Sequence, residues 1–367
     1  MKIRDEAEFI PGLKLSEMFY NEVVQPILDE HFPKLAHSAG LLGKWGSDVL
    51  GFDTPQSTDH GWGPRVILFL GETEYPQLKD RIIATLSDKL PYQFHGYSTH
   101  FVTASDGAPV MKRITKGKID HKVEVTTIRR FFNRHLKIDP FSEITATDWL
   151  TFSEQTLLEI TAGKVFHDGL NELCSLRTKF SYYPEDLWRY LLAAQWRRIE
   201  QEEPFVGRCG DVGDELGSKI IAARLVRDLM RLCFLMEKVY APYPKWFGTA
   251  FAKLRCAKVL GPLLESVLGT STWKEREQHL SQAYEVVAQM HNTLSITPSL
   301  EPKVRPFHNR PYLIINGDRF AQAIRATIED EDVLGLPEHI GSVDQFSDST
   351  DILSYPKHRV QLKVLYT

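Results

Sequence analysis

The first part of the chain alternates between apolar runs of strand length and segments whose apolar side chains recur at helical spacing. Residues 15–32 and 75–91 have the helical spacing, and one proline interrupts the first of them. Strands are predicted at residues 35–43, 65–71, 94–102 and 121–128. The order helix, strand, loop, strand, helix, strand, strand predicts a small mixed α/β domain that ends near residue 140.

The pattern becomes almost entirely helical beyond residue 147 and remains so to about residue 294. Turn residues separate the successive helices. The predicted helices lie at residues 153–163, 169–180, 184–203, 215–240, 245–268 and 272–294. We therefore expect an α+β protein with a mixed-sheet domain over residues 1–140 and a helical bundle over residues 141–298. Residues 299–367 form an extension with one strand candidate at 311–317 and one helix candidate at 318–328, and the sequence does not define its role.

Composition narrows the class of protein. The hydrophobic fraction of 43% and charged fraction of 25% are typical of a globular protein in water, and the net charge of −4 does not favour a nucleic-acid or membrane partner. No segment approaches the run of roughly 18 apolar residues that a membrane helix needs. The four cysteines show no CxxC spacing and are expected to be free thiols: Cys174, Cys209, Cys233 and Cys256. We expect a cytoplasmic protein.

The candidate chemistry lies in the polar loop between the first two predicted strands. Gly46 and Ser47, predicted to enter a helix, would let the backbone approach phosphate oxygens and would supply hydroxyl and N–H donors. Asp59, expected on the following strand, could then hold a divalent cation beside those phosphates. Glu124 alternates with Val123 and Val125, so it could point away from the core as a further acid.

This pattern of Gly-Ser, a gap, Ser-x-Asp and a later apolar-acid-apolar strand resembles the DNA polymerase β-like nucleotidyltransferase superfamily. The aminoglycoside (kanamycin-type) branch is the most similar, because it joins such a domain to a helical bundle. The resemblance implies transfer of a nucleoside monophosphate from an NTP, with ATP the first candidate, to a hydroxyl of a small acceptor, with release of pyrophosphate. It further implies that Gly46 and Ser47 bind the triphosphate, that Asp59 and Glu124 hold Mg²⁺, and that Glu124 is the general base.

One position departs from the family pattern. The motif ends in Asp-x-Asp, and the second acid is replaced here by Gly61. A two-metal site needs carboxylates to offset its charge, so Asp48, Asp53 or His60 would have to compensate, or the nucleotide phosphates would. Two alternatives therefore stay open: a non-catalytic nucleotide-binding module and a transferase that acts on an RNA end. The segments GSDVLGFDT, STDHGWGPR and YAPYPKWFG also resemble an uncharacterised bacterial branch known only as a domain of unknown function.

The helical part offers a second set of candidates. Arg224, Arg227 and Arg231 share one helix face and could meet a triphosphate, or form a solvated basic face paired with acids such as Asp228 and Glu237. Lys245, next to Trp246 at a helix start, is the residue that we expect to bind nucleotide. The glycines at 207, 210 and 213 imitate a phosphate loop, but no clear strand precedes them and a plain loop is expected. The acceptor and the oligomeric state are not defined by the sequence.

Overall fold

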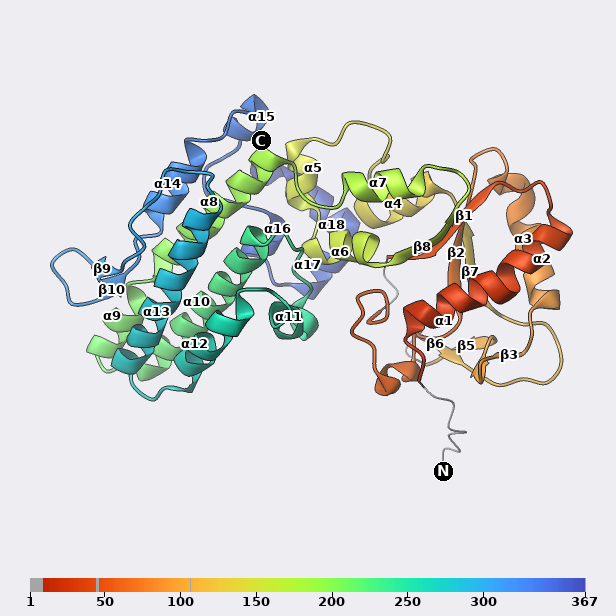
Figure 1. The fold of residues 1–367 in the computed structure, drawn as a ribbon, viewed down its shortest axis with the longest axis horizontal. Coiled ribbons are helices and arrows are strands. Elements are labelled where there is room, and N and C mark those ends of the chain that lie inside the picture. Colours follow the sequence, from red (N-terminus) through yellow and green to blue (C-terminus); the bar gives the residue numbers. More distant parts are fainter. Residues whose placement is uncertain (1–8, 44–45, 106, 367) are drawn as a thin grey trace. The chain divides into compact units, whose positions relative to one another are not determined.

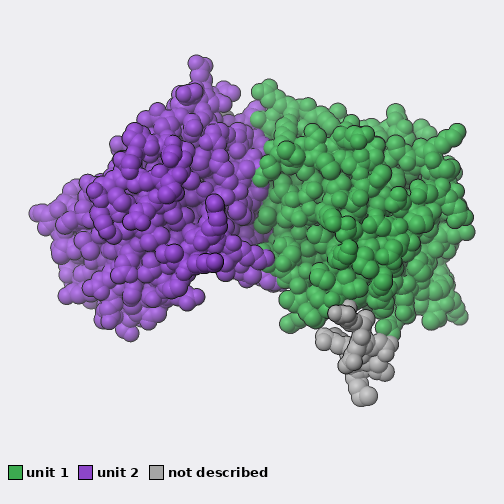
Figure 2. Space-filling model, viewed as in Figure 1, with its two compact units in different colours: residues 1–144, 156–181 green, residues 145–155, 182–367 purple. Residues whose placement is uncertain are grey.

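The computed structural model describes residues 9–43, 46–105 and 107–366. The chain forms two compact units, which Figure 2 colours separately: residues 1–144 with 156–181, and residues 145–155 with 182–367. A mixed four-stranded sheet lies in the first unit and helices dominate the second, which confirms the predicted α+β class. No helix in the described part of the chain has the length and apolar character needed to cross a bilayer.

The first unit is built on one sheet with the strand order β7-β2-β1-β8 (Figure 1). Its strands are β1 (His37–Leu41), β2 (Arg65–Leu70), β7 (Lys122–Thr126) and β8 (Lys164–Asp168). β1 is antiparallel to both β2 and β8, whereas β2 is parallel to β7, with Ile67 opposite Glu124. A parallel pair needs a crossover, which α3 (Tyr75–Lys89) and a set of short strands provide.

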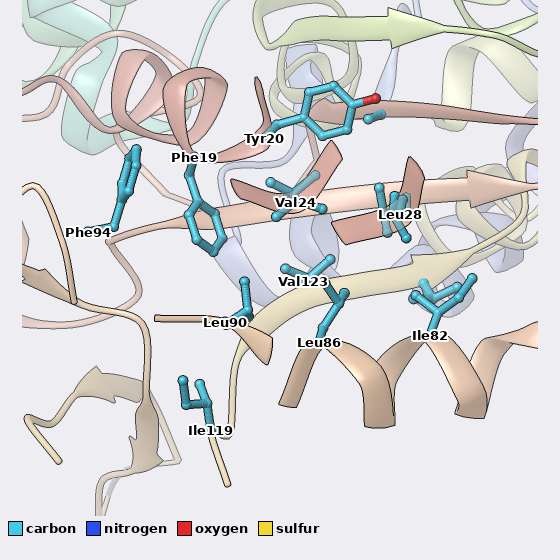
Figure 3. Close-up of a cluster of buried hydrophobic side chains, with 14 of the residues drawn as sticks. Phe19, Tyr20, Val24, Leu28, Ile82, Leu86, Leu90, Phe94, Ile119 and Val123 are labelled. Atoms are coloured by element: carbon cyan, nitrogen blue, oxygen red, sulfur yellow. The ribbon is translucent and has the colours of Figure 1, made fainter. Parts of the chain in front are cut away.

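One face of the sheet carries a hydrophobic core. The first described helical segment runs without a break through α1 (Gly12–Phe19), a π-helical turn (Tyr20–Val24) and α2 (Gln25–His31), which confirms the helix predicted for residues 15–32. Figure 3 shows Phe19 and Val24 from this segment and Ile82 from α3 gathered near Val123 of β7. These side chains are almost fully buried, so their apolar area is the main stabilising contribution to this unit.

The opposite face is covered by α4 (Ile128–Leu136) and α7 (Leu173–Lys179). Phe69 of β2 meets Phe131 of α4 edge-on at 5.4 Å, and Phe132 packs on Phe180 at 5.1 Å. Helix α4 begins where the Thr127 side chain accepts the N–H of Arg130, and it ends at Lys137 in the left-handed conformation.

Two segments of the first unit differ from the prediction. Residues 94–102 are not one strand, because turns divide them among the short strands β3 (Gln93–Phe94), β4 (Tyr97–Ser98) and β5 (Phe101–Thr103), the last paired with β6 (Pro109–Met111). The segment between α6 (Glu154–Ala162) and α7 was predicted as part of the helical bundle, yet it contains β8. Pairing with β1 outweighs the helical pattern on either side of this short strand.

The second unit is a helical assembly whose longest helices are α8 (Glu185–Glu202), α10 (Glu215–Met236) and α13 (Trp273–Thr293). Helix α8 packs against α10 and α14 (Asp318–Arg325), and Trp196 stacks on Phe320 at 4.3 Å. Further helices are α5 (Ala146–Thr151), α9 (Phe205–Asp211), α11 (Pro244–Phe251) and α12 (Ala257–Gly269). The C-terminal part adds β9 (Arg305–Pro306), β10 (Leu313–Ile314), α15 (Glu331–Leu334), α16 (Val343–Phe346), α17 (Thr350–Ser354), α18 (Pro356–Gln361) and a final 3₁₀ turn (Leu362–Tyr366).

Two features of this unit correct the sequence prediction, and a third shows how the C-terminal extension is attached. The single helix expected at residues 245–268 is two helices, α11 and α12, separated by a turn. The glycines at 207 and 210 lie in helix α9 instead of a loop, and Gly210 is needed because a Cβ there would lie 2.0 Å from a ring atom of Trp273. The C-terminal extension is anchored to the bundle by Glu203, whose buried carboxyl oxygens accept the N–H groups of Ile315, Asn316 and Gly317 at 2.6, 3.1 and 3.2 Å.

Candidate functional site

The predicted phosphate loop joins β1 to β2. Gly46 and Ser47 lead into a turn over residues 47–51, closed by the Phe52 N–H donating to the Ser47 carbonyl at 2.8 Å. They do not enter a helix, contrary to the prediction. Gly46 is exposed with φ 110°, a backbone conformation that favours glycine, and an added Cβ would meet no heavy atom closer than 3.7 Å. The backbone here is therefore open to a close approach by a ligand.

Asp59 lies at the end of a 3₁₀ turn, Pro55–Asp59, and not on β2 as predicted. The turn forms because Thr54 and Ser57 make a reciprocal capping box in front of Pro55. The carboxylate is 58% exposed, and His60 Nδ1 lies 3.0 Å from Oδ1. Slight burial raises the pKa of Asp59, but the hydrogen bonds and charge of His60 more than offset it, so the net pKa is lowered. Asp59 is therefore ionised and accessible at neutral pH.

A second loop acid, Asp48, is committed to a buried ion pair with Arg65. Both side chains are 1% exposed, and Arg65 Nη2 donates to Asp48 Oδ2. Burial raises the pKa of the Asp48 carboxyl, and the Arg65 guanidinium opposes the rise. Because Arg65 begins β2, this pair fixes the loop to the sheet.

The third loop acid, Asp53, connects the loop to the first helix. Its Oδ2 accepts the Gly12 N–H at 2.7 Å and the Trp62 indole N–H at 2.9 Å. Trp62 is buried and stacks on Phe9, so it is a packing residue. Since Asp48 and Asp53 both have structural partners, neither is placed to compensate for the missing acid at Gly61.

Position 61 has room for a side chain. Gly61 has φ 61°, no heavy atom lies within 4 Å of an added Cβ, and its N–H donates to the Pro109 carbonyl at 2.7 Å. Aspartate tolerates this left-handed conformation better than most residues. The acid expected here from the sequence resemblance is thus absent, and the space beside Gly61 is open.

Glu124 lies on β7, on the sheet face opposite that of Val123 and Val125, in agreement with the alternation. Its Oε1 is 2.5 Å from Arg134 Nη2 on α4. It lines a pocket between α3 and α4 to which Asp59 does not contribute, and no hydrogen bond or ion pair among the described residues joins the two acids. Sequence reasoning missed the basic residues of this pocket, because it predicted α3 but not helix α4, which brings Arg130 and Arg134 to it.

These donors fit a metal ion only in part. Within residues 9–43, 46–105 and 107–366, no three His, Cys, Asp or Glu side chains are grouped closely enough to hold a metal ion. Mg²⁺ is commonly bound by one or two carboxylates together with substrate phosphates. The loop therefore suits a magnesium ion that nucleotide phosphates help to hold at Asp59, and does not by itself supply the ligands for two metals.

Lys245 lies in the first turn of helix α11 in the second unit. It is exposed, and its Nζ lies 4.9 Å from the ring centroid of Trp246. A cation at this position is available to an anion, and its assignment to the nucleotide stays a prediction.

The three arginines of α10 are all paired with acids from other elements: Arg224 with Glu202 at 2.5 Å, Arg227 with Asp348 at 3.3 Å and Arg231 with Glu154 at 3.6 Å. The expected partners Asp228 and Glu237 bind other arginines, Arg198 and Arg255. Arg231 is buried, so the helix face is not a uniformly solvated one. The pairing favours a structural role for this row of arginines.

Comparisons with known proteins gave one partial family match and one remote structural match. Residues 149–247 match the model of a family described as "Domain of unknown function (DUF4037)", a segment that contains β8 and leaves out residues 46–59. No curated protein matches the chain. Among solved structures, one match is a nucleotidyltransferase-like protein from Exiguobacterium sibiricum 255-15, with 9% identity, a TM-score of 0.31, and coverage of 78% of this chain and 82% of that chain.

Proposed function

We propose that this protein is a nucleotidyltransferase, which transfers a nucleoside monophosphate from an NTP to a hydroxyl of a small acceptor and releases pyrophosphate. The observation that supports it most is the loop itself. An open glycine backbone at Gly46 and an exposed, ionised carboxylate at Asp59 lie on one loop, which a buried ion pair holds to the sheet. This combination suits a triphosphate with its metal ion.

The roles follow from what each group offers. Gly46 and Ser47 would donate N–H and hydroxyl hydrogen bonds to phosphate oxygens, and Lys245 would add a positive charge. Asp59 would hold Mg²⁺, whose charge supports departure of pyrophosphate. Glu124, the residue that matches the family's base, would first have to exchange Arg134 for the acceptor hydroxyl.

Label transfer from α-³²P-ATP with Mg²⁺, across a panel of hydroxylated acceptors, tests the proposal. Asp59→Ala should abolish transfer, whereas Asp80→Ala, which removes an exposed acid of α3, should leave it unchanged. Gly61→Asp should lower the Mg²⁺ concentration needed for half-maximal transfer, since the open space at 61 would regain its acid. Transfer that survives Asp59→Ala would refute the assignment.

One observation favours a second candidate, a nucleotide-binding module without catalysis. Asp48 and Asp53 are engaged by structural partners, and Glu124 forms an ion pair with Arg134, so none of the three acids is free to take part in catalysis. Calorimetry with a non-hydrolysable ATP analogue separates the two. Binding that depends on Asp59, together with no pyrophosphate release over the whole acceptor panel, would support the module.

A further inference from the structure

We propose that the pocket on the open edge of β7 binds a small phosphorylated ligand, held by Lys79, Arg130 and Lys137. The pocket has a volume of about 500 Å³ and lies between α3, α4 and β7. Strand β7 ends the sheet order, so no further strand among the described residues pairs with its outer edge. The pocket does not include Gly46, Ser47 or Asp59, but it does include Glu124, the base of the proposed function. Anion binding by the three basic residues does not require Glu124 to act as a base, so this proposal can hold where the proposed function fails.

Two helices direct basic side chains to this pocket. Helix α3 contributes Tyr75 and Lys79, one turn apart, and α4 contributes Arg130 and Arg134, which share a face at a spacing of four. Lys137 lines the same pocket from the left-handed position that ends α4. The Arg130 guanidinium lies 4.7 Å from the Tyr75 ring centroid, and Lys79 Nζ lies 5.6 Å from the same centroid. Cations from the two helices therefore converge on one ring.

The charges in the pocket are unbalanced. Glu124 pairs with Arg134, which leaves Lys79, Arg130 and Lys137 without an ion-pair partner among the described residues. Like charges held near one another destabilise the fold slightly unless an anion accompanies them. This local surplus stands out in a chain whose net charge is −4. A phosphate group, which takes several charge-assisted hydrogen bonds, is the anion that such a set suits best.

The shape and Glu124 indicate a small ligand and not a nucleic-acid backbone. The volume lies in the range of pockets for metabolite-sized molecules. A carboxylate in the pocket would repel a run of phosphates, but it accepts a hydroxyl group well. The chemistry that fits is a phosphate ester with a free hydroxyl near its phosphate.

Calorimetry at low ionic strength tests this with two probes, inorganic pyrophosphate and glycerol 3-phosphate. The double variant Lys79→Gln, Lys137→Asn removes two charges and keeps a residue suited to the positive φ of 61° at position 137. We expect it to weaken binding of both probes by about tenfold or more, since two charge-assisted contacts are lost. Lys89→Gln, at the exposed end of α3 outside the pocket, should leave both affinities unchanged.

Glu124→Gln provides a change of opposite sign. It releases Arg134 and removes the negative charge, so pyrophosphate should bind severalfold more tightly. Unchanged binding in both pocket variants, or binding of neither probe by the wild type at about 10 mM, would overturn the proposal. Pyrophosphate binding that falls with Ser47→Ala, and not with the double variant, would also overturn it, while leaving the proposed function of the loop intact.

Discussion

The buried ion pair beneath the candidate loop yields the most direct test of how the loop is held. Arg65→Met removes the guanidinium and leaves the carboxylate of Asp48, which is 1% exposed, without its cation. Breaking a buried pair in this way costs about 3 to 5 kcal/mol, because a charge stays in a medium that solvates it poorly. For a unit of this size we expect the melting temperature to fall by about 6 to 20 °C, at roughly 2 to 4 °C per kcal/mol.

The complementary changes complete a double-mutant cycle. Asp48→Leu alone leaves a buried guanidinium and should also be destabilising. The double variant Asp48→Leu, Arg65→Met replaces the pair with apolar side chains of similar size, and such replacements are often close to neutral. The coupling energy between the two positions should therefore be about 3 kcal/mol or more.

Hydrogen exchange of the β1 and β2 amides in increasing urea measures the unfolding free energy of the first unit separately from that of the helical bundle. The exposed pair of Lys118 and Asp88, 3.5 Å apart, is the control, and Lys118→Met should change the unfolding free energy by less than about 1 kcal/mol. Single-variant losses that add to within about 0.5 kcal/mol of the double-variant loss would show that the pair does not act as a unit.

Two further predictions concern stability. Burial raises the pKa of Glu203 to about 8. The folded state therefore keeps a proton on Glu203 at pH values where the unfolded chain has lost it. The resulting contribution to stability is full below about pH 4.5 and is lost as the pH rises through about 8. Urea titrations should therefore show the wild type losing up to about 4 kcal/mol relative to Glu203→Gln between about pH 5 and 9, and a difference that does not change with pH would contradict the reasoning. Gly163→Ala should lower the unfolding free energy by about 1 to 3 kcal/mol, because the added Cβ would lie 2.1 Å from the Leu41 carbonyl oxygen. Gly248→Ala, where the added Cβ meets open space in α11, should stabilise the protein slightly. Equal melting temperatures of the two variants would refute this reasoning.

Strong local patterns were enough to predict the framework of the first unit. The β-branched run at β2, the alternation at β7 and the periodicity of α3 each agree with the structure. Strand β8 escaped prediction because five residues within a helical stretch carry little pattern, and its conformation depends on pairing with β1, distant in sequence. The split between α11 and α12 was missed for a related reason, since both halves are apolar at helical spacing.

The sequence indicated which segments carry the candidate residues, but not the contacts that those residues make. Gly46, Ser47 and Asp59 do lie on the loop between β1 and β2, and Glu124 does point to the face that alternation gives it. The commitment of Asp48 to Arg65 could not be foreseen, because the two residues meet only when the loop folds back on the strand. The pairing of Glu124 with Arg134 likewise depends on how α4 lies against β7.

The position of β8 has a consequence for how the polypeptide can be synthesised and divided. A nascent chain that has reached residue 144 has all of β7, β2 and β1, but β1 is still an edge whose N–H and C=O groups are open to a neighbouring chain. The fourth strand is added only after residues 145–155 have been made, and these belong to the other unit. A gene fragment that ends near residue 144 would thus encode a protein with an exposed β1 edge that is prone to aggregate. The smallest fragment that contains all four strands of the sheet must extend through residue 168.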